Sequence, residues 1–253
     1  MKFRILQTGF QNAAFNMALD EVLIERIARG ESKPALRLYR WKPAAISIGY
    51  FQSLQAEVDE TRCQALGIDI IRRQTGGGAV LHDQEITYSM HIPLSFGLVP
   101  QTILDSYQKI SEGIIQGLAI LWLRATFVPL NDIVVNGQKI SGNAQTRKQG
   151  ILLQHGTILK SVDVDRMFEV LKVPQEKMKG KLIADIKQRV TSIDQQLKRE
   201  TPFQVIEQAL IKGFATAFPK IEFESDTLTS EEITATQALS QAKYAKSVWN
   251  HQR

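Results

Sequence analysis

The spacing of apolar residues predicts a helix near the start of the chain, followed by two short strands. Between residues 16 and 29, apolar side chains recur at intervals of three and four, which is the period of an amphipathic helix. Runs rich in apolar and aromatic residues at 35–41 and 44–50 predict strands. Lys42-Pro43 separates these runs, and proline, with its fixed φ and no N–H, suits a connection between strands.

Strand and helix patterns continue through the middle of the chain. By the same criteria we expect strands at 67–73, 85–93 and 151–160 and a long helix over 102–123. Residues 132–141 predict a β-hairpin, because Asn-Gly at its centre accepts the positive φ values of a type I′ turn. A two-residue loop gives three facing pairs: Val135 with Gln138, Val134 with Lys139, and Ile133 with Ile140.

Helical patterns dominate the last third of the chain. The predicted helices are 163–171, 177–189, 201–218, with Thr201 as its cap, and 231–249, and a short strand at 221–225 interrupts them. The order of elements predicts an α+β fold with a mixed, mainly antiparallel β-sheet core and peripheral helices. We interpret residues 1–253 as a single domain.

Composition is ordinary for a globular protein and excludes several functional classes. Hydrophobic residues make up 43% of the 253 residues, and the formal net charge is +5. Basic residues do not alternate with aromatic ones in any run, which argues against nucleic-acid binding. The longest apolar stretches are shorter than the roughly 20 residues that span a bilayer, so we expect no membrane segment. A single cysteine, Cys63, fits a reducing compartment, and we expect a cytoplasmic protein.

The segment 72–83 is the first candidate for chemistry. Three consecutive glycines let a backbone approach a ligand and turn its N–H groups toward oxygens, and preceding arginines can bind phosphate or carboxylate. The candidate residues are Arg72, Arg73, Thr75, Gly76, Gly77, Gly78, Ala79 and His82. The alternative is a glycine-rich turn whose arginines are solvated.

Two further candidates follow. Lys139 lies on a strand whose register the turn sets, so its ammonium can point into a pocket, with Ser141 and Gly142 just after it. A solvated charge on an edge strand is the alternative. His155-Gly156-Thr157 can face a ligand, although a buried, hydrogen-bonded histidine is the more frequent case. The four histidines lack metal-ligand spacing, and Cys63 lies far from these motifs in the sequence.

Taken together, these segments resemble the lipoate–protein ligase and octanoyltransferase superfamily, whose fold is related to that of biotin protein ligases. The resemblance runs from about Phe15 to the terminus. It rests on six motifs in order: Asn16-Met17-Ala18-Leu19-Asp20-Glu21, Gly49-Tyr50-Phe51-Gln52, Arg72 to Asp83, Asn131-Asp132, Lys139-Ile140-Ser141-Gly142, and His155-Gly156-Thr157.

Within this superfamily the chain is similar to LipM-type octanoyltransferases at 84–89, 144–147 and 151–157. Those enzymes form a thioester on a cysteine just before the lysine hairpin. Residues 126–132 contain no cysteine here, and a thioester cannot form without a thiol. Asn131-Asp132 instead resembles the ATP-using lipoate ligases, so the resemblance implies a lipoate–protein ligase.

The resemblance implies that lipoate reacts with ATP to give lipoyl-AMP and that an acceptor lysine then takes the lipoyl group. It places Lys139 near the acyl carbonyl and the α-phosphate, and the glycines with Arg73 around the lipoyl and phosphate groups. Asn131 and Asp132 would hold Mg²⁺ or the adenylate. His82 and His155 would shape the pocket. Apolar groove candidates are Tyr39, Trp41, Ile48 and Tyr50, the last preceded by Gly49.

The implied acceptors are lipoyl domains of dehydrogenase E2 subunits and the glycine cleavage H protein. Many such ligases carry an additional C-terminal domain or an accessory protein, so we expect a separate accessory chain. An octanoyltransferase that uses acyl carrier protein without ATP is the nearest alternative. A protein that binds lipoate or lipoyl domains without catalysis is the alternative from another class.

Overall fold

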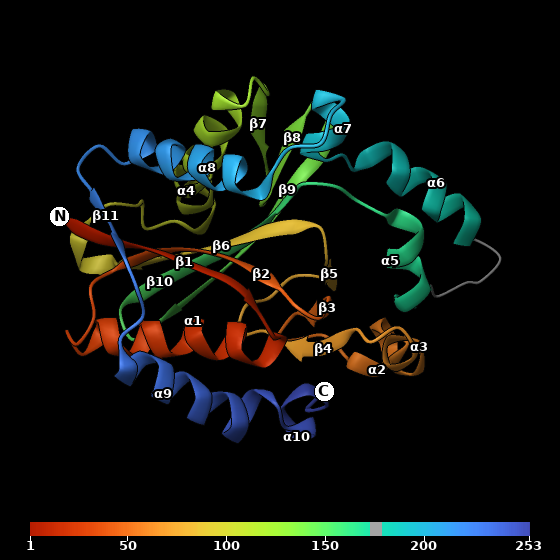
Figure 1. Cartoon of the computed structure of the whole chain (residues 1–253), viewed down its shortest axis with the longest axis horizontal. Helices are drawn as coiled ribbons and strands as arrows, with labels where there is room; N and C mark the ends of the chain where they lie inside the picture. The colour runs from red at the N-terminus through yellow and green to blue at the C-terminus, as the bar shows by residue number, and fades with distance from the viewer. Residues whose placement is uncertain (173–178) are drawn as a thin grey trace.

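An eight-stranded mixed sheet forms the centre of the molecule (Figure 1). The computed structural model describes residues 1–172 and 179–253. In spatial order the strands are β11 (Glu222–Asp226), β1 (Lys2–Gln11), β2 (Ala35–Trp41), β6 (Glu85–Pro93), β10 (Ile151–Leu159), β9 (Gln138–Lys148), β8 (Asp132–Val135) and β7 (Ala125–Val128). The pairs β11–β1 and β1–β2 are parallel, and the others are antiparallel. The α+β prediction is confirmed.

A second, three-stranded sheet lies beside the first and carries the glycine-rich segment. Its order is β4 (Asp69–Arg72), β3 (Ala45–Ile48) and β5 (Val80–His82). β3 pairs in parallel with β4 and antiparallel with β5, so residues 73–79 connect the two outer strands. The short helices α2 (Leu54–Glu57) and α3 (Glu60–Ala65) lie in the connection between β3 and β4.

Helices cover both faces of the large sheet (Figure 1). On one face α1 (Ala13–Ala28) packs against the sheet, with α9 (Ser230–Leu239) alongside it. On the other face lie α4 (Ile103–Ile120) and α8 (Phe203–Ala217). Remaining helical segments are η1 (Leu94–Phe96), α5 (Val164–Val170), α6 (Lys179–Arg189), α7 (Ile193–Leu197), the π-helical turn η3 (Ser240–Tyr244) and α10 (Ser247–Asn250). No helix among the described residues combines the length and apolarity needed to span a bilayer.

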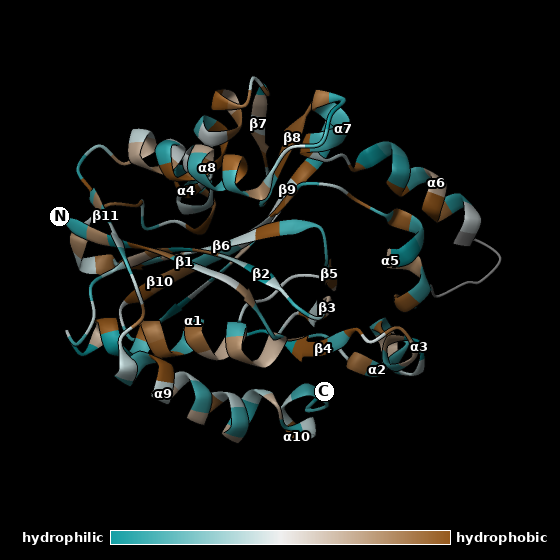
Figure 2. Ribbon diagram, viewed as in Figure 1, coloured by the Kyte–Doolittle hydropathy of each residue, from teal (hydrophilic) through white to brown (hydrophobic). Residues whose placement is uncertain are grey.

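The largest apolar core lies between the sheet and the α4–α8 pair. Hydropathy colouring shows apolar positions of these helices facing the strands (Figure 2). Glycines allow α4 and α8 to approach closely. A Cβ on Gly213 would lie 2.2 Å from the backbone nitrogen of Gly117 and 2.3 Å from the carbonyl oxygen of Gly113. These glycines therefore set the distance between the two helices.

Three strands were not predicted: β1, β5 and β7. β1 pairs in parallel with β2 and with the distant β11. Parallel strands are not joined by a hairpin turn, so the sequence carries no turn signal for this pairing. The predicted hairpin is present, with positive φ at Asn136 and Gly137. Its register is wrong in one pair, because a bulge shifts Ile133 from Ile140 to Ser141.

Two predictions for the last third of the chain are also wrong. The expected single helix 231–249 is divided into α9, the π-helical turn and α10, because Lys246 adopts extended backbone with ψ of 133°. Thr201 does not cap α8: Pro202 occupies the cap position, and the Thr201 hydroxyl is buried without a hydrogen-bond partner. Residues 177–178 of the expected helix 177–189 lie outside the described residues.

A charged network is buried between α1 and the sheet. The Asp20 carboxylate accepts hydrogen bonds from Arg37 (3.0 Å) and Ser89 (2.8 Å), and both Asp20 and Arg37 are almost fully buried. Burial by itself would raise the pKa of Asp20, but His155 and Arg37 outweigh it and hold the pKa well below its usual value of 3.8. The carboxylate is therefore charged in the folded protein at neutral pH.

The close contact between α4 and α8 predicts that Gly213→Ala destabilises the fold by about 3 kcal/mol, because a Cβ would push against backbone atoms that cannot move alone. Urea unfolding measures this. Gly180→Ala on α6 is the matched control: its Cβ would meet nothing within 4 Å, and alanine is the better helix former, so stability stays equal or rises slightly. Equal stability of the Gly213 variant and the wild type would contradict the packing argument.

The buried ion pair between Asp20 and Arg37 predicts that Asp20→Asn lowers the free energy of unfolding by an amount that depends on pH. At pH 7 we expect a loss of about 3–5 kcal/mol, because Arg37 keeps its charge without a partner. The folded-state pKa of Asp20 is depressed, so its stabilisation is complete above pH 4 and disappears as the pH falls below 3.8. Urea unfolding at pH 7, 5 and 3 will show the gap between variant and wild type narrowing. Asp165→Asn, which removes an exposed ion pair with Lys187, will change stability little.

Candidate active site

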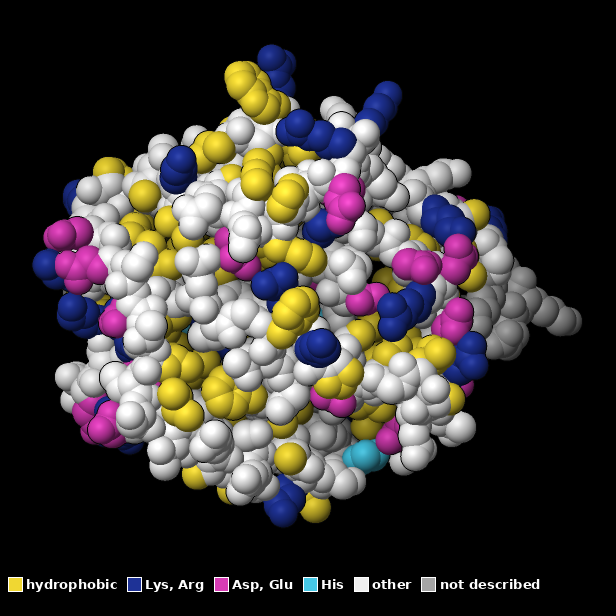
Figure 3. Space-filling model, viewed as in Figure 1, with side chains coloured by type: hydrophobic (Ala, Val, Ile, Leu, Met, Phe, Trp, Pro, Cys, Tyr) yellow, Lys and Arg dark blue, Asp and Glu magenta, His cyan; other side chains and the backbone are white. Residues whose placement is uncertain are grey.

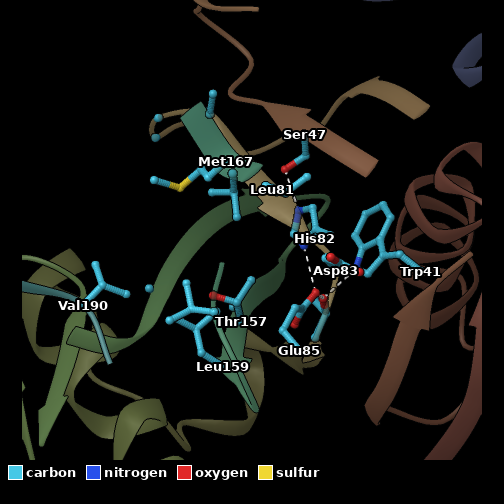
Figure 4. Close-up of a pocket in the computed structure, with 18 of the residues that line it drawn as sticks. Trp41, Ser47, Leu81, His82, Asp83, Glu85, Thr157, Leu159, Met167 and Val190 are labelled. Atoms are coloured by element: carbon cyan, nitrogen blue, oxygen red, sulfur yellow. Dashed lines mark hydrogen bonds and ion pairs between the residues drawn. The ribbon is translucent and has the colours of Figure 1, made fainter. Parts of the chain in front are cut away.

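A cavity of about 570 Å³ opens between the small sheet, strands β9 and β10, and the α5–α6 segment (Figure 4). Most of its surface is apolar. Lys, Arg, Asp and Glu side chains are interspersed over the face of the molecule seen in Figure 3, and on that face they do not form one large basic patch. The dimensions and lining are those of a site for a small, mostly apolar ligand.

The glycine segment 75–79 is pressed against the end of β3. A Cβ on Gly49 would lie 2.1 Å from the carbonyl oxygen of Gly77, so only glycine permits this approach. The Tyr50 amide donates to the carbonyl oxygen of Thr75 over 2.8 Å, and Gly77 has a φ of 96°. Gly49, Tyr50 and Thr75 therefore hold the segment in position without lining the cavity. Gly77, Gly78 and Ala79 line the cavity.

Arg73 holds this segment in place. Its Nη2 donates to the carbonyl oxygens of Gly76 and Gly78, each over 2.8 Å. Its Nη1 donates to the carbonyl oxygen (3.0 Å) and the hydroxyl (3.1 Å) of Ser47, and its Nε donates to the Thr75 hydroxyl (3.2 Å). Burial lowers the pKa of Arg73 to about 10, which leaves it charged at neutral pH. The guanidinium lines the cavity as a fixed cation.

Arg72 is not in the cavity, which corrects the expectation that both arginines face a ligand. Its guanidinium donates to carbonyl oxygens of Gly49, Tyr50, Gln52, Trp249 and Asn250, and the side chain is fully buried. Alternate residues of a strand point to opposite faces, so neighbouring Arg72 and Arg73 cannot both point the same way. Arg72 joins β4 to the C-terminal segment.

Lys139 lines the cavity on β9. Its Nζ lies 2.7 Å from Oδ1 of Asp132 on the neighbouring strand. A Cβ on Gly142 would lie 2.9 Å from this Nζ, so the glycine leaves the space that the amine occupies. The side chain remains 42% exposed, which keeps the amine accessible from the cavity.

Asp132 does not fit the expected role of a Mg²⁺ ligand. Its carboxylate is already paired with Lys139, and it does not line the cavity. Asn131 does line it, but its amide donates to the carbonyl oxygen of Asn143. Within residues 1–172 and 179–253, no group of three or more His, Cys, Asp and Glu side chains is arranged to hold a metal ion.

Both predicted histidines line the cavity, and in each of them one ring nitrogen lies within hydrogen-bond distance of a side-chain hydroxyl. His155 Nε2 is 2.7 Å from the Thr75 hydroxyl, and its Nδ1 is 3.5 Å from an Asp20 carboxylate oxygen. His82 Nε2 is 2.8 Å from the Ser47 hydroxyl, and its Nδ1 is 2.9 Å from Glu85. Burial lowers the pKa of His82, with Glu85 opposing it, so the imidazole is neutral at pH 7.

The structure brings most of the predicted site residues to one cavity. Those that line it are Tyr39, Arg73, Gly77, Gly78, Ala79, His82, Asn131, Lys139, Gly142, His155, Gly156 and Thr157. Those outside the lining are Gly49, Tyr50, Arg72, Thr75, Gly76, Asp132 and Ser141. Ser141 is fully buried, as is Ile48, which packs in an apolar cluster and does not form part of the groove.

The apolar wall contributed by α5 and the segment after α6 was not predicted. Val164, Met167, Phe168 and Leu171 line the cavity, and so does Val190. The first four recur at intervals of three, one and three, which is the stripe of an amphipathic helix. That pattern was visible in the sequence, but a stripe alone does not tell whether it covers a core or a ligand.

Comparisons with known proteins identify the family of this chain. The model of the lipoyl protein ligase A/B catalytic domain matches residues 12–215. An octanoyltransferase LipM of Geobacillus kaustophilus is 36% identical over 274 residues, covering 99% of this chain and 98% of the relative.

Solved structures of lipoate protein ligases are also similar to this chain. One structure, of a bi-partite lipoate protein ligase and its E2 lipoyl domain from Thermoplasma acidophilum, matches with a TM-score of 0.87 and 31% identity, covering 99% of this chain and 96% of the other. Another, of lipoate-protein ligase A bound with ATP, matches with a TM-score of 0.83 and 29% identity, covering 99% of each chain. With a family model matched over most of its length and a 36% identical relative over nearly all of it, this chain belongs to the lipoyl protein ligase A/B catalytic domain family.

Proposed function

We propose that this protein transfers an octanoyl or lipoyl group from an activated donor to a lysine amine of a lipoyl domain. The observation that carries the proposal is the position of Lys139, an accessible cation that shares one cavity with the glycine segment and with an apolar wall. The apolar wall suits the alkyl chain of the acyl group. The glycine segment suits its polar end, because backbone N–H groups without side chains can face oxygens.

The chemistry needs a cation where negative charge develops. When the acceptor amine attacks the acyl carbon, the carbonyl oxygen becomes an oxyanion until the leaving group departs. A fixed ammonium or guanidinium in a partly dry cavity stabilises that charge more than water does. Lys139 is the partly exposed cation of the site, and Arg73 is the buried one.

A thioester on the protein's own cysteine is not part of this proposal. Cys63 is fully buried in an apolar cluster with Ile46 and Leu54. Burial, with the nearby Asp59 carboxylate, raises the pKa of its thiol to about 11. A thiol that is neither accessible nor ionised cannot carry an acyl group.

Two alternative donors of the acyl group are considered: a carrier-protein thioester and an acyl-AMP made from ATP. The octanoyltransferase relatives match over the full chain, and they favour octanoyl carried on a protein thioester over the ATP-dependent ligase that we expected from the sequence. The ligase remains the second candidate for a specific reason. The cavity offers no thiol, and a lipoate-protein ligase A structure with bound ATP has the same fold. A Mg²⁺ ion is not assigned to either route.

The acceptor is proposed to be a lipoyl domain of a dehydrogenase E2 subunit, supported by the fold shared with a ligase solved with its E2 lipoyl domain. The bi-partite nature of that ligase also supports a separate accessory chain for this protein. The glycine cleavage H protein stays a prediction from the sequence resemblance.

Replacing Lys139 tests the catalytic role. We expect Lys139→Met to reduce acceptor acylation about 10²–10³-fold, as removal of one donor to an oxyanion does, while octanoate or lipoate binding measured by calorimetry is retained. Lys212→Met removes an exposed lysine of α8 and is the control, with unchanged activity. Unchanged activity of the Lys139 variant would contradict a catalytic role for this amine, and no acylation by the wild type would favour a protein that binds the ligand without catalysis.

The donor is tested by weighing an acceptor lipoyl domain after two incubations with the purified protein. One contains octanoyl-acyl carrier protein and no ATP, and the other contains lipoate, ATP and Mg²⁺. Because the full-length relatives are octanoyltransferases, we expect the octanoyl mass increase in the first incubation. Modification only in the second, with pyrophosphate release, identifies the ligase. If neither labels the acceptor, even with an accessory chain added, the transfer function is wrong.

A further inference from the structure

A second set of polar side chains, separate from Lys139, lines the cavity. Ser47 on β3, His82 on β5 and Glu85 on β6 form a row joined by hydrogen bonds of 2.8 Å (Ser47 Oγ to His82 Nε2) and 2.9 Å (His82 Nδ1 to Glu85 Oε1) (Figure 4). All three side chains are at most 5% exposed, and all three line the cavity. The function proposed above does not use this row.

Arg73 sets the direction of the hydrogen bonds in the row. A guanidinium can only donate, and its Nη1 donates to the Ser47 hydroxyl over 3.1 Å. The hydroxyl therefore accepts from Arg73 and is free to give its own proton to His82 Nε2. His82 then carries its proton on Nδ1, where Glu85 accepts it. A serine whose proton points at a neutral imidazole, itself held by a carboxylate, has the arrangement of a nucleophile with its base.

The neighbours of His82 and Glu85 keep this geometry fixed. The Trp41 indole stacks on the imidazole with ring centroids 4.1 Å apart. The same indole donates to the Thr87 hydroxyl (2.7 Å), which donates to the Glu85 oxygen that faces His82 (2.6 Å). The imidazole plane and the carboxylate are thus held independently of any ligand.

A parallel row, Thr75–His155–Asp20, does not meet the same conditions. Both Thr75 and Ser47 are buried, but Thr75 does not line the cavity, whereas Ser47 does. The distance from His155 Nδ1 to Asp20 is 3.5 Å, which is long for a hydrogen bond. Of the two residues whose hydroxyls accept from Arg73, only Ser47 is among those that line the cavity.

We propose that Ser47 is a nucleophile that hydrolyses medium-chain acyl esters and thioesters in this cavity. Ser47 Oγ attacks the acyl carbon as its proton passes to His82 Nε2, and the bond from the acyl carbon to the leaving oxygen or sulfur breaks as that proton reaches the leaving group. Water then attacks the acyl-serine ester and gives a proton to His82. The ester bond breaks, Ser47 recovers the proton, and a free carboxylic acid leaves.

The surroundings of Ser47 fit both ends of such a substrate. Arg73 Nη1 lies 3.1 Å from Ser47 Oγ, so its charge is close to the carbonyl oxygen that becomes negative when Ser47 attacks. Leu81, Leu159 and Met167 line the same cavity and give the alkyl chain an apolar surface (Figure 4). Octanoyl esters are therefore expected to react faster than acetyl esters, because an acetyl group is too short to cover this apolar surface.

The test is hydrolysis of p-nitrophenyl octanoate by the full-length protein without acceptor or ATP, so its outcome is independent of the transfer function. We expect Ser47→Ala to lower the rate at least about 10²-fold. Ser111→Ala is the matched control: it removes a buried serine hydroxyl on α4 that has no hydrogen-bond partner and is outside the cavity, and its rate stays at the wild-type value. Thermal unfolding of both variants reports whether each is folded.

Trapping the intermediate in the wild-type protein avoids any dependence on variants. After acid quenching during turnover, intact mass should rise by one octanoyl group, and peptide mapping should place it on Ser47 as a hydroxylamine-sensitive ester. A hydroxylamine-resistant label on Lys139 would overturn the proposal. So would an absence of label together with equal rates for Ser47→Ala and the wild type.

Discussion

The hydrogen bonds of one buried guanidinium organise the whole cavity. Arg73 can only donate, and its Nε, Nη1 and Nη2 are all engaged, with the glycine segment, with the end of β3 and with two hydroxyls. The loop therefore cannot relax away from the sheet without leaving a buried charge unpaired, which is costly. The same bonds orient the hydroxyls of Ser47 and Thr75, which in turn contact His82 and His155.

Lys139 adds a partly exposed cation to this buried one. The turn at Asn136-Gly137 and the bulge that follows place its amine beside Asp132, and the missing side chain of Gly142 leaves room for it. Before a ligand binds, the pair carries no net charge. A phosphate or a developing oxyanion can then exchange places with the Asp132 carboxylate, so the cation becomes available where new negative charge appears.

The chemical groups that line the cavity do not include the protein's one cysteine. Its only thiol is buried in an apolar cluster, whereas hydroxyls, two neutral or paired imidazoles and two cations face or support the ligand space. In the proposed transfer, this site stabilises charge on an acyl group that arrives already activated.

Local signals in the sequence determined much of this. The spacing of apolar residues, Asn136-Gly137 and the glycine run established the α+β class, the hairpin and the segments that form the site, because each reports a backbone conformation that neighbouring residues dictate. Tertiary structure alone decided three other features. It decided which of Arg72 and Arg73 lines the cavity, paired β1 with the distant β11, and brought Ser47, His82 and Glu85 into one row from three strands. These depend on contacts between residues far apart in the chain or on which face of a strand is buried, and no local pattern encodes them.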